Sequence, residues 1–216
     1  MRRLPSGARI VVQTTPRSGP GAATVAIQLW VLAGTADERK GEHGCAHLLE
    51  HMLFKPLEID GRKVDIASQI EALGGDVNAF TSHDETVFHA TVPVRSFRPA
   101  LAALVRPIAW ARPRAPDLAQ EAEVVLEEIK QYDDDPAARS MQDMIAALFG
   151  GHDYGRPVLG TAPEIAAHRA RTLQRFLARN YGGDRLALVV AGPLPPAKVV
   201  SAAREVLREF DARPGP

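Results

Sequence analysis

Two histidines and a glutamate stand close together in the sequence at spacings that suit a metal site. His47 and His51 are four residues apart, and Glu50 directly precedes His51. On a helix, residues i and i+4 lie on one face, so both imidazoles can reach one ion. Glu50 can then reach a water on that ion. This His-x-x-Glu-His order suits metal-assisted hydrolysis, and the alternative is a half-exposed helix with two ordinary surface histidines.

A catalytic zinc site needs a third protein ligand, with a fourth position open to water. Residues 118–132 have a helical pattern that contains Glu121 and Glu128. Seven residues fall only about 20° short of two full turns, so these two glutamates share a face. Glu127 points elsewhere and is expected to be a surface charge. Because acidic helix faces are common, the same interpretation stays open for Glu121 and Glu128 taken alone.

Composition excludes several classes of protein. Lys and Arg number 26 and Asp and Glu number 26, so the net charge is zero and a sequence-independent nucleic-acid binder is disfavoured. The single cysteine, Cys45, excludes an intrachain disulfide and an all-cysteine metal site. Residues 25–33 form the longest apolar stretch, which is too short to span a bilayer. No apolar signal segment follows Met1, so we expect a cytoplasmic protein with neither nucleic-acid nor membrane partners.

The elements that must position the site are mainly strands in the first half of the chain and mainly helices in the second. Strands are expected at 8–14, 22–32, 76–81, 85–93 and 186–191. The strand at 22–32 carries apolar residues on both faces, which predicts that both faces are largely covered. Helices are expected at 43–55, 62–73, 97–108, 118–132, 138–149, 173–181 and 197–210, with Asp117 as the N-cap of the fourth. The pattern predicts one α+β domain over residues 1–211, with a mostly antiparallel sheet covered by helices, and a tail or interdomain linker at 212–216.

These motifs together resemble the pitrilysin/insulysin family of inverted-zinc metallopeptidases, which includes the mitochondrial processing peptidases. The resemblance is closest to the processing-peptidase-like bacterial members. It rests on His47-x-x-Glu50-His51, followed by Glu128 within Val-Val-Leu-Glu-Glu-Ile. Further matching blocks follow in order along the chain. They are Glu-His-Gly-Cys-Ala at 42–46, Met-Leu-Phe-Lys at 52–55, Gly-Gly-Asp-Val-Asn-Ala-Phe-Thr-Ser at 74–82, Asp-Asp-Pro at 134–136 and Tyr-Gly-Arg-Pro-Val-Leu-Gly-Thr at 154–161.

The resemblance implies a role for each matching residue. His47, His51 and Glu128 would bind one Zn²⁺ per chain, and Glu50 would be the general base of a metalloendopeptidase. Glu121 would orient His47 or His51 through a ring N–H. Three positions would form a strand edge on which a substrate peptide lies extended, namely Asn78, Ala79 and Phe80.

The remaining histidines and the cysteine receive structural roles. Cys45 is expected to be a small packed residue that faces away from the metal. His43 is expected to be a cap or surface group, because Gly44 makes an earlier helix start unfavourable. His83, His89, His152 and His168 lack partners at ligand spacing and are treated as structural.

The resemblance also implies that this chain is incomplete as an enzyme. Members of the family are built from two homologous halves that form a clamshell, and the second half supplies an Arg/Tyr pair for the substrate and oxyanion. The chain accounts for the N-terminal, metal-bearing half, so alone it is expected to bind zinc and to cleave short or unfolded peptides poorly. A separate partner subunit is favoured because the chain begins with Met1, and the pairing is then a heterodimer. An excised N-terminal domain, a homodimer, a non-catalytic scaffold and a small-molecule zinc hydrolase are the alternatives.

Overall fold

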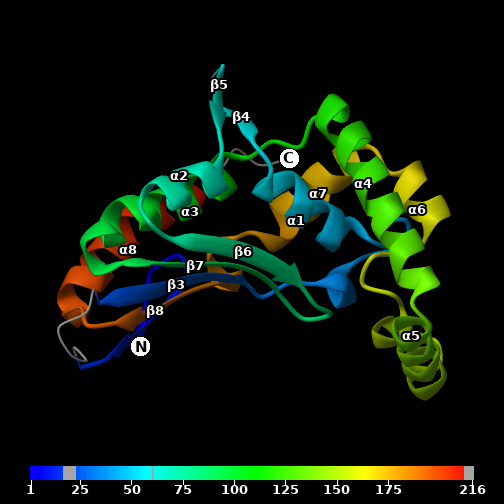
Figure 1. Ribbon diagram of the computed structural model, residues 1–216, viewed down its shortest axis with the longest axis horizontal. Coiled ribbons are helices and arrows are strands. Elements are labelled where there is room, and N and C mark those ends of the chain that lie inside the picture. Colours follow the sequence, from blue (N-terminus) through cyan, green and yellow to red (C-terminus); the bar gives the residue numbers. More distant parts are fainter. Residues whose placement is uncertain (17–22, 60, 212–216) are drawn as a thin grey trace.

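A twisted sheet forms one layer of the molecule (Figure 1), and six strands make it up among the described residues. In this computed structural model, which describes residues 1–16, 23–59 and 61–211, the strand order is β1-β2-β8-β3-β7-β6. All neighbouring strands are antiparallel except β2 and β8, which confirms the mostly antiparallel sheet predicted from the sequence. The strands are β1 Arg2–Arg3, β2 Arg9–Thr14, β3 Thr24–Val31, β6 Asp76–Thr81, β7 Thr86–Pro93 and β8 Leu186–Gly192.

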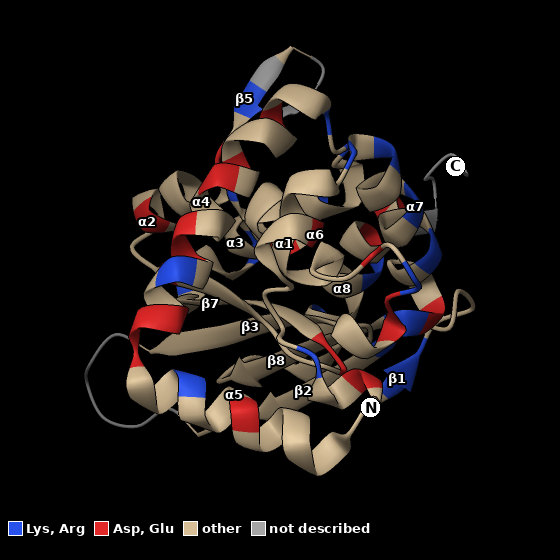
Figure 2. Ribbon diagram, turned by 90° about the vertical axis from the view of Figure 1, so that its right-hand side faces the viewer, with Lys and Arg blue, Asp and Glu red and all other residues tan. Residues whose placement is uncertain are grey.

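Most of the helices lie on one side of this sheet, and α5 lies beyond its end (Figure 1). They are α1 Cys45–Phe54, α2 Ile66–Ala72, α3 Phe97–Trp110, α4 Ala115–Asp134, α5 Pro136–Phe149, α6 Ala162–Ala167, α7 Ala170–Asn180 and α8 Pro196–Asp211. Short 3₁₀ turns occur at η1 Thr35–Asp37, η2 Val94–Ser96, η3 Asp153–Gly155 and η4 Gly183–Arg185, and a small hairpin pairs β4 Leu57–Ile59 with β5 Arg62–Val64. Acidic and basic residues are interspersed over these elements, with acidic positions recurring along α4 (Figure 2).

Alternation along β3 shows where the core lies. Val25, Ile27, Leu29 and Val31 are fully buried against the helices. The intervening residues of β3, Ala26, Gln28 and Trp30, are only half-buried. The second face of this strand is therefore less completely covered than the first, because the helices gather on the first.

The helices differ from the sequence expectation at several points. Residues 62–64 are in β5, so α2 begins only at Ile66. Its N-cap is Asp65, whose side chain accepts the Ala67 and Ser68 N–H groups. Asp117 lies inside the first turn of α4 and pairs with Arg114, and the N-cap is Arg114. The six-residue helix α6 was not expected, since it is too short for its periodicity to be distinctive. The predicted tail at 212–216 lies outside the described residues.

This arrangement places α1 at the junction of three elements. It packs against the edge strand β6, against α4 and against α7. Its residues are almost all buried, from Cys45 to Leu53 apart from His51, which is half-buried. A helix that carries two histidines is thus held between a free sheet edge and a long acidic helix.

Candidate metal centre

His47 and His51 lie on the face of α1 that meets α4. Their ring centroids are 4.6 Å apart, and both rings approach Glu128 of α4. The Glu128 Oε2 atom is 3.7 Å from His47 Nε2 and 3.4 Å from His51 Nε2. One ligand atom from each of the three side chains lies within 4.8 Å of the other two. The structure therefore brings together two helices whose key residues are 77 positions apart in the sequence.

Glu121 lies next to the cluster of His47, His51 and Glu128 but is not part of it, and it is almost fully buried. Its Oε2 atom is 3.7 Å from His51 Nδ1, and its Oε1 atom is 3.6 Å from Lys55 Nζ. Among the described residues, Glu121 Oε2 and the buried His47 Nδ1 have no hydrogen-bond partner. Glu121 thus faces the ring nitrogen of His51 that points away from Glu128.

Glu50 turns from the same helix toward the sheet edge. The Thr81 hydroxyl, at the end of β6, donates a hydrogen bond of 2.7 Å to Glu50 Oε2. Burial raises the pKa of the Glu50 carboxyl, and the Thr81 hydrogen bond and the charge of His51 oppose this only in part. A carboxyl whose pKa lies above its usual range is a stronger base, as general-base catalysis requires.

The two imidazoles have opposite pKa shifts. Burial, together with His51, lowers the pKa of His47 to about 4, so His47 is neutral at pH 7. Burial also acts to lower the pKa of His51, but contact with Glu128 and the charges of Glu50 and Glu121 outweigh it and raise the pKa. The same contact with His51 lowers the pKa of Glu128. The centre therefore offers a neutral imidazole and an ionised carboxylate, which are the forms that bind metals.

The edge of β6 runs alongside this cluster. Asn78 and Phe80 are exposed, while Ala79 is half-buried on the opposite, core-facing side. The Ala79 N–H donates to its neighbour's side-chain oxygen, Asn78 Oδ1, at 2.8 Å. Phe80 contacts Trp30 and His89 on the sheet face that the helices leave free, with centroid distances of 6.4 and 6.2 Å. The strand edge is thus free of a neighbouring strand among the described residues.

The donor set fits zinc. Two imidazoles and one carboxylate are a common ligand set of catalytic zinc, which keeps a fourth position open. Ligands about 2.0–2.2 Å from a tetrahedral zinc lie roughly 3.3–3.6 Å apart. The observed separations of 3.4 and 3.7 Å from Glu128 Oε2 to the two Nε2 atoms need only a small adjustment.

The structure also shows the surroundings of Cys45 and His43, which lie at or near the start of α1. Cys45 is fully buried, as expected, and its Sγ atom is 3.8 Å from the His168 ring. His43 lies between Glu38 and Arg156, outside the three-ligand cluster. The sequence did not predict a role for Glu38, Lys55 or Thr81. Thr81 stands within the block at 74–82, but only the packing of β6 on α1 shows that it reaches Glu50.

The fold and the cluster together define a class: an α+β domain with a two-histidine, one-glutamate centre of the kind found in zinc hydrolases. Residues 14–162 match the family described as Insulinase (Peptidase family M16), and this chain belongs to that family. A protein named as an uncharacterized zinc protease of Mycobacterium leprae is 36% identical over 202 residues, which are 94% of this chain and 44% of that protein. The chain thus spans less than half the length of this relative.

Solved structures show the same fold. An M16-like peptidase from Alicyclobacillus acidocaldarius superposes with a TM-score of 0.86 at 18% identity, over 100% of this chain and 50% of that one. A Pseudomonas fluorescens structure, named as a peptidase M16 inactive domain, gives a TM-score of 0.85 at 22% identity, over 100% and 51%. Among the described residues, no helix is both long and apolar enough to cross a membrane.

Proposed function

We propose that this chain is the zinc-binding part of a metalloendopeptidase. The observation that carries the proposal is the convergence of His47, His51 and Glu128 beside Glu50, at the free edge of β6. The zinc protease names of relatives such as that of M. leprae support the same chemistry. His47, His51 and Glu128 would hold one zinc ion, and Glu121 would orient His51 through its Nδ1–H.

The chain's own residues can supply the proton transfers. A bound zinc would act as a Lewis acid toward the peptide carbonyl and lower the pKa of water to about 7. Glu50 would take the proton of the attacking water, because burial raises its pKa and Thr81 holds one of its oxygens. Glu50 would then return that proton to the leaving amine, so that hydrolysis ends with the carboxylate regenerated.

The substrate would be a short or unfolded peptide added to the sheet as a further strand. Backbone pairing along a free edge gives affinity with little side-chain specificity. The Ala79 N–H, now bonded to Asn78 Oδ1, is available for such pairing once the Asn78 side chain moves aside. Phe80 would contact a substrate side chain from the exposed face of β6.

A second homologous unit would complete the enzyme, as a partner subunit in a heterodimer or as a further part of a longer polypeptide. The chain covers only 44% of its M. leprae relative and 50% of the A. acidocaldarius structure, which supports this part of the proposal. Helix α5 has no buried residue and exposes Met141, Met144 and Leu148 along one face. Apolar faces of this kind are typical of contact surfaces. A cytoplasmic location stays a prediction from the sequence.

A non-catalytic domain of the same fold is the alternative. The name of the P. fluorescens structure shows that inactive M16 domains exist. Here all four residues of the zinc and general-base set are present and close together, which favours the peptidase.

The test is to isolate the native complex through this chain and to assay peptide cleavage and zinc content with and without a chelator. We expect zinc in proportion to this chain and cleavage that the chelator abolishes and zinc restores. A complex that holds zinc but cleaves no peptide would support the non-catalytic alternative. A complex without zinc would contradict the metal assignment itself.

A further inference from the structure

The helix that carries both histidines cannot cap its own N-terminus. Its N-cap residue is Gly44, at φ +82°, and a glycine has no side chain to accept the free N–H groups of the first turn. A Cβ atom at this position would lie 2.6 Å from Ile165 Cδ1 and 2.9 Å from the Leu159 carbonyl oxygen. A capping side chain at position 44 is therefore excluded by both conformation and space.

Glu38 supplies the missing acceptors from outside the helix. Its Oε2 atom accepts the Gly44 N–H at 3.0 Å, and its Oε1 atom accepts the Ala46 N–H at 2.8 Å. The side chain is buried at the start of the helix, where the N–H groups of the first turn lack acceptors within the helix. Both oxygens of one buried carboxyl are thus directed at the start of α1.

The cap matters for the metal centre because of where the histidines stand in α1. His47 is the third residue of the helix and belongs to the first turn, whose N–H groups lack acceptors four residues earlier. His51 stands one turn further on. Loss of the cap would let the first turn fray, and this would displace His47 more than His51.

We infer that Glu38 is a positioning residue that holds the first turn of α1, and with it His47, in the metal-binding arrangement. The inference rests on the proposed function, since it takes His47 as a zinc ligand. Glu38 touches neither the substrate nor the three ligand side chains. It acts through the backbone of residues 44–46.

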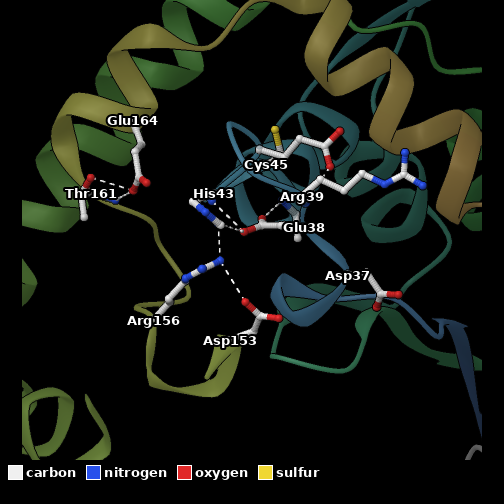
Figure 3. A network of polar contacts seen from close by, with 12 residues as sticks. Asp37, Glu38, Arg39, His43, Cys45, Asp153, Arg156, Thr161 and Glu164 are labelled. Carbon is white, nitrogen blue, oxygen red and sulfur yellow. Dashed lines mark hydrogen bonds and ion pairs between the residues drawn. The ribbon is translucent and has the colours of Figure 1, made fainter. Parts of the chain in front are cut away.

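A second set of contacts holds the same helix start against a distant loop (Figure 3). His43 Nδ1 is 3.8 Å from Glu38 Oε2 and 3.0 Å from Arg156 Nη1. Arg156 pairs with Asp153 at 2.9 Å, and His168 Nε2 contacts the His43 carbonyl oxygen at 2.8 Å. These contacts hold His43, which directly precedes the Gly44 N-cap, against residues of the distant segment 153–168.

The chain offers a matched control in Asp65, the N-cap of α2. Its Oδ1 atom accepts the Ala67 and Ser68 N–H groups, so it performs the same capping on a helix that carries no ligand. Removing either cap is expected to lower the melting temperature. Only the Glu38 cap should affect zinc.

The experiment measures the zinc dissociation constant of the purified chain by competition with a chromogenic chelator, together with the melting temperature. We expect Glu38→Ala to weaken zinc binding by about five- to tenfold, the typical worth of a helix cap. Glu38→Gln keeps one acceptor and should weaken it less. It also serves as the test variant if Glu38→Ala does not fold. Asp65→Ala should leave the zinc dissociation constant unchanged.

Two outcomes would contradict the inference, and they differ from failure of the proposed function. Equal zinc affinity in Glu38→Gln, Glu38→Ala and the unmodified chain would show that the cap does not position His47. So would an equal loss in Asp65→Ala, since the effect would then follow stability alone. If instead the unmodified chain binds no zinc, or His47→Ala binds it as tightly, the metal assignment fails and the role of Glu38 fails with it.

Discussion

Glu50 owes its suitability as a base to two opposing influences on one carboxyl. Burial raises its pKa, and the Thr81 hydroxyl and His51 restrain that rise. We expect Glu50→Gln to reduce the kcat of the complete enzyme by roughly 100-fold or more, because a general base contributes about 10²–10⁴-fold. Zinc content should not change. Glu127→Gln, on the exposed side of α4, is the control, and unaltered cleavage in Glu50→Gln would contradict the assignment.

Neighbouring residues on α4 also provide a direct test of the third ligand. Glu128 lies 3.4 and 3.7 Å from the two histidine rings, whereas the exposed Glu127 pairs with Lys130. Glu128→Gln should weaken zinc binding strongly, because a neutral amide is a poor zinc ligand, and Glu127→Gln should leave it intact. Chelator competition on the purified chain measures both. Equal affinity for the two variants would exclude Glu128 as a ligand.

The buried Glu38 predicts how stability depends on pH. Burial raises the pKa of its carboxyl to about 8, although the Ala46 and Gly44 N–H groups act to lower it. The folded protein therefore keeps this proton up to about pH 8, whereas the unfolded chain releases it near the ordinary value of 4.5. Between these values the folded state binds more protons, so Glu38 makes the free energy of unfolding fall as pH rises.

Glu38→Gln removes that titration, so its free energy of unfolding should depend less on pH between about 5 and 8. The largest slope that one group can cause is about 1.4 kcal/mol per pH unit. Urea unfolding of the metal-free chain at several pH values measures it. The same slope in the Glu38→Gln variant would show that other groups cause the dependence.

At the scale of elements, the edge strand β6 determines how a peptide could bind. The Ala79 N–H is bonded to Asn78 Oδ1. Because the Ser82 N–H donates to the Glu85 carbonyl and ladder bonds alternate along an antiparallel pair, the Ala79 N–H points away from β7, so Ala79→Pro removes a donor that the sheet does not use. Proline is tolerated on edge strands for this reason. We expect this variant to fold and to bind zinc, but to show a raised KM for peptides. Ala79→Gly, which keeps the N–H, is the control, and an unchanged KM in Ala79→Pro would argue against strand addition.

At the scale of the molecule, the three proposed zinc ligands lie in a chain that spans only 44% of its M. leprae relative. The isolated chain should bind zinc as tightly as the complete enzyme does, because all three ligands lie in α1 and α4. Its kcat/KM should be lower by about 100-fold or more, the typical effect of missing oxyanion donors. Peptide assays on the chain and on the captured native complex, at equal zinc occupancy, compare them. Equal activity would show that no second unit is needed.

Much of the centre was determined by the sequence alone, because helix geometry is local. The spacing of His47 and His51, and that of Glu121 and Glu128, follow from the helical period wherever those helices lie. The mostly antiparallel α+β fold also follows from alternating and helical patterns that each stretch of chain carries within itself. The start of α2 was missed because the short strand β5 gives too few residues for a pattern.

The tertiary structure decided which of these local faces meet. Only the packing of α1 between β6 and α4 places Glu128 against both histidines, Thr81 against Glu50 and Glu121 against His51. The Glu38 cap likewise depends on a loop folding back onto Gly44 and Ala46. Contacts of this kind join side chains to partners outside their own helix. They form because the elements bury a shared apolar core, and the spacing of residues within one element does not encode that packing.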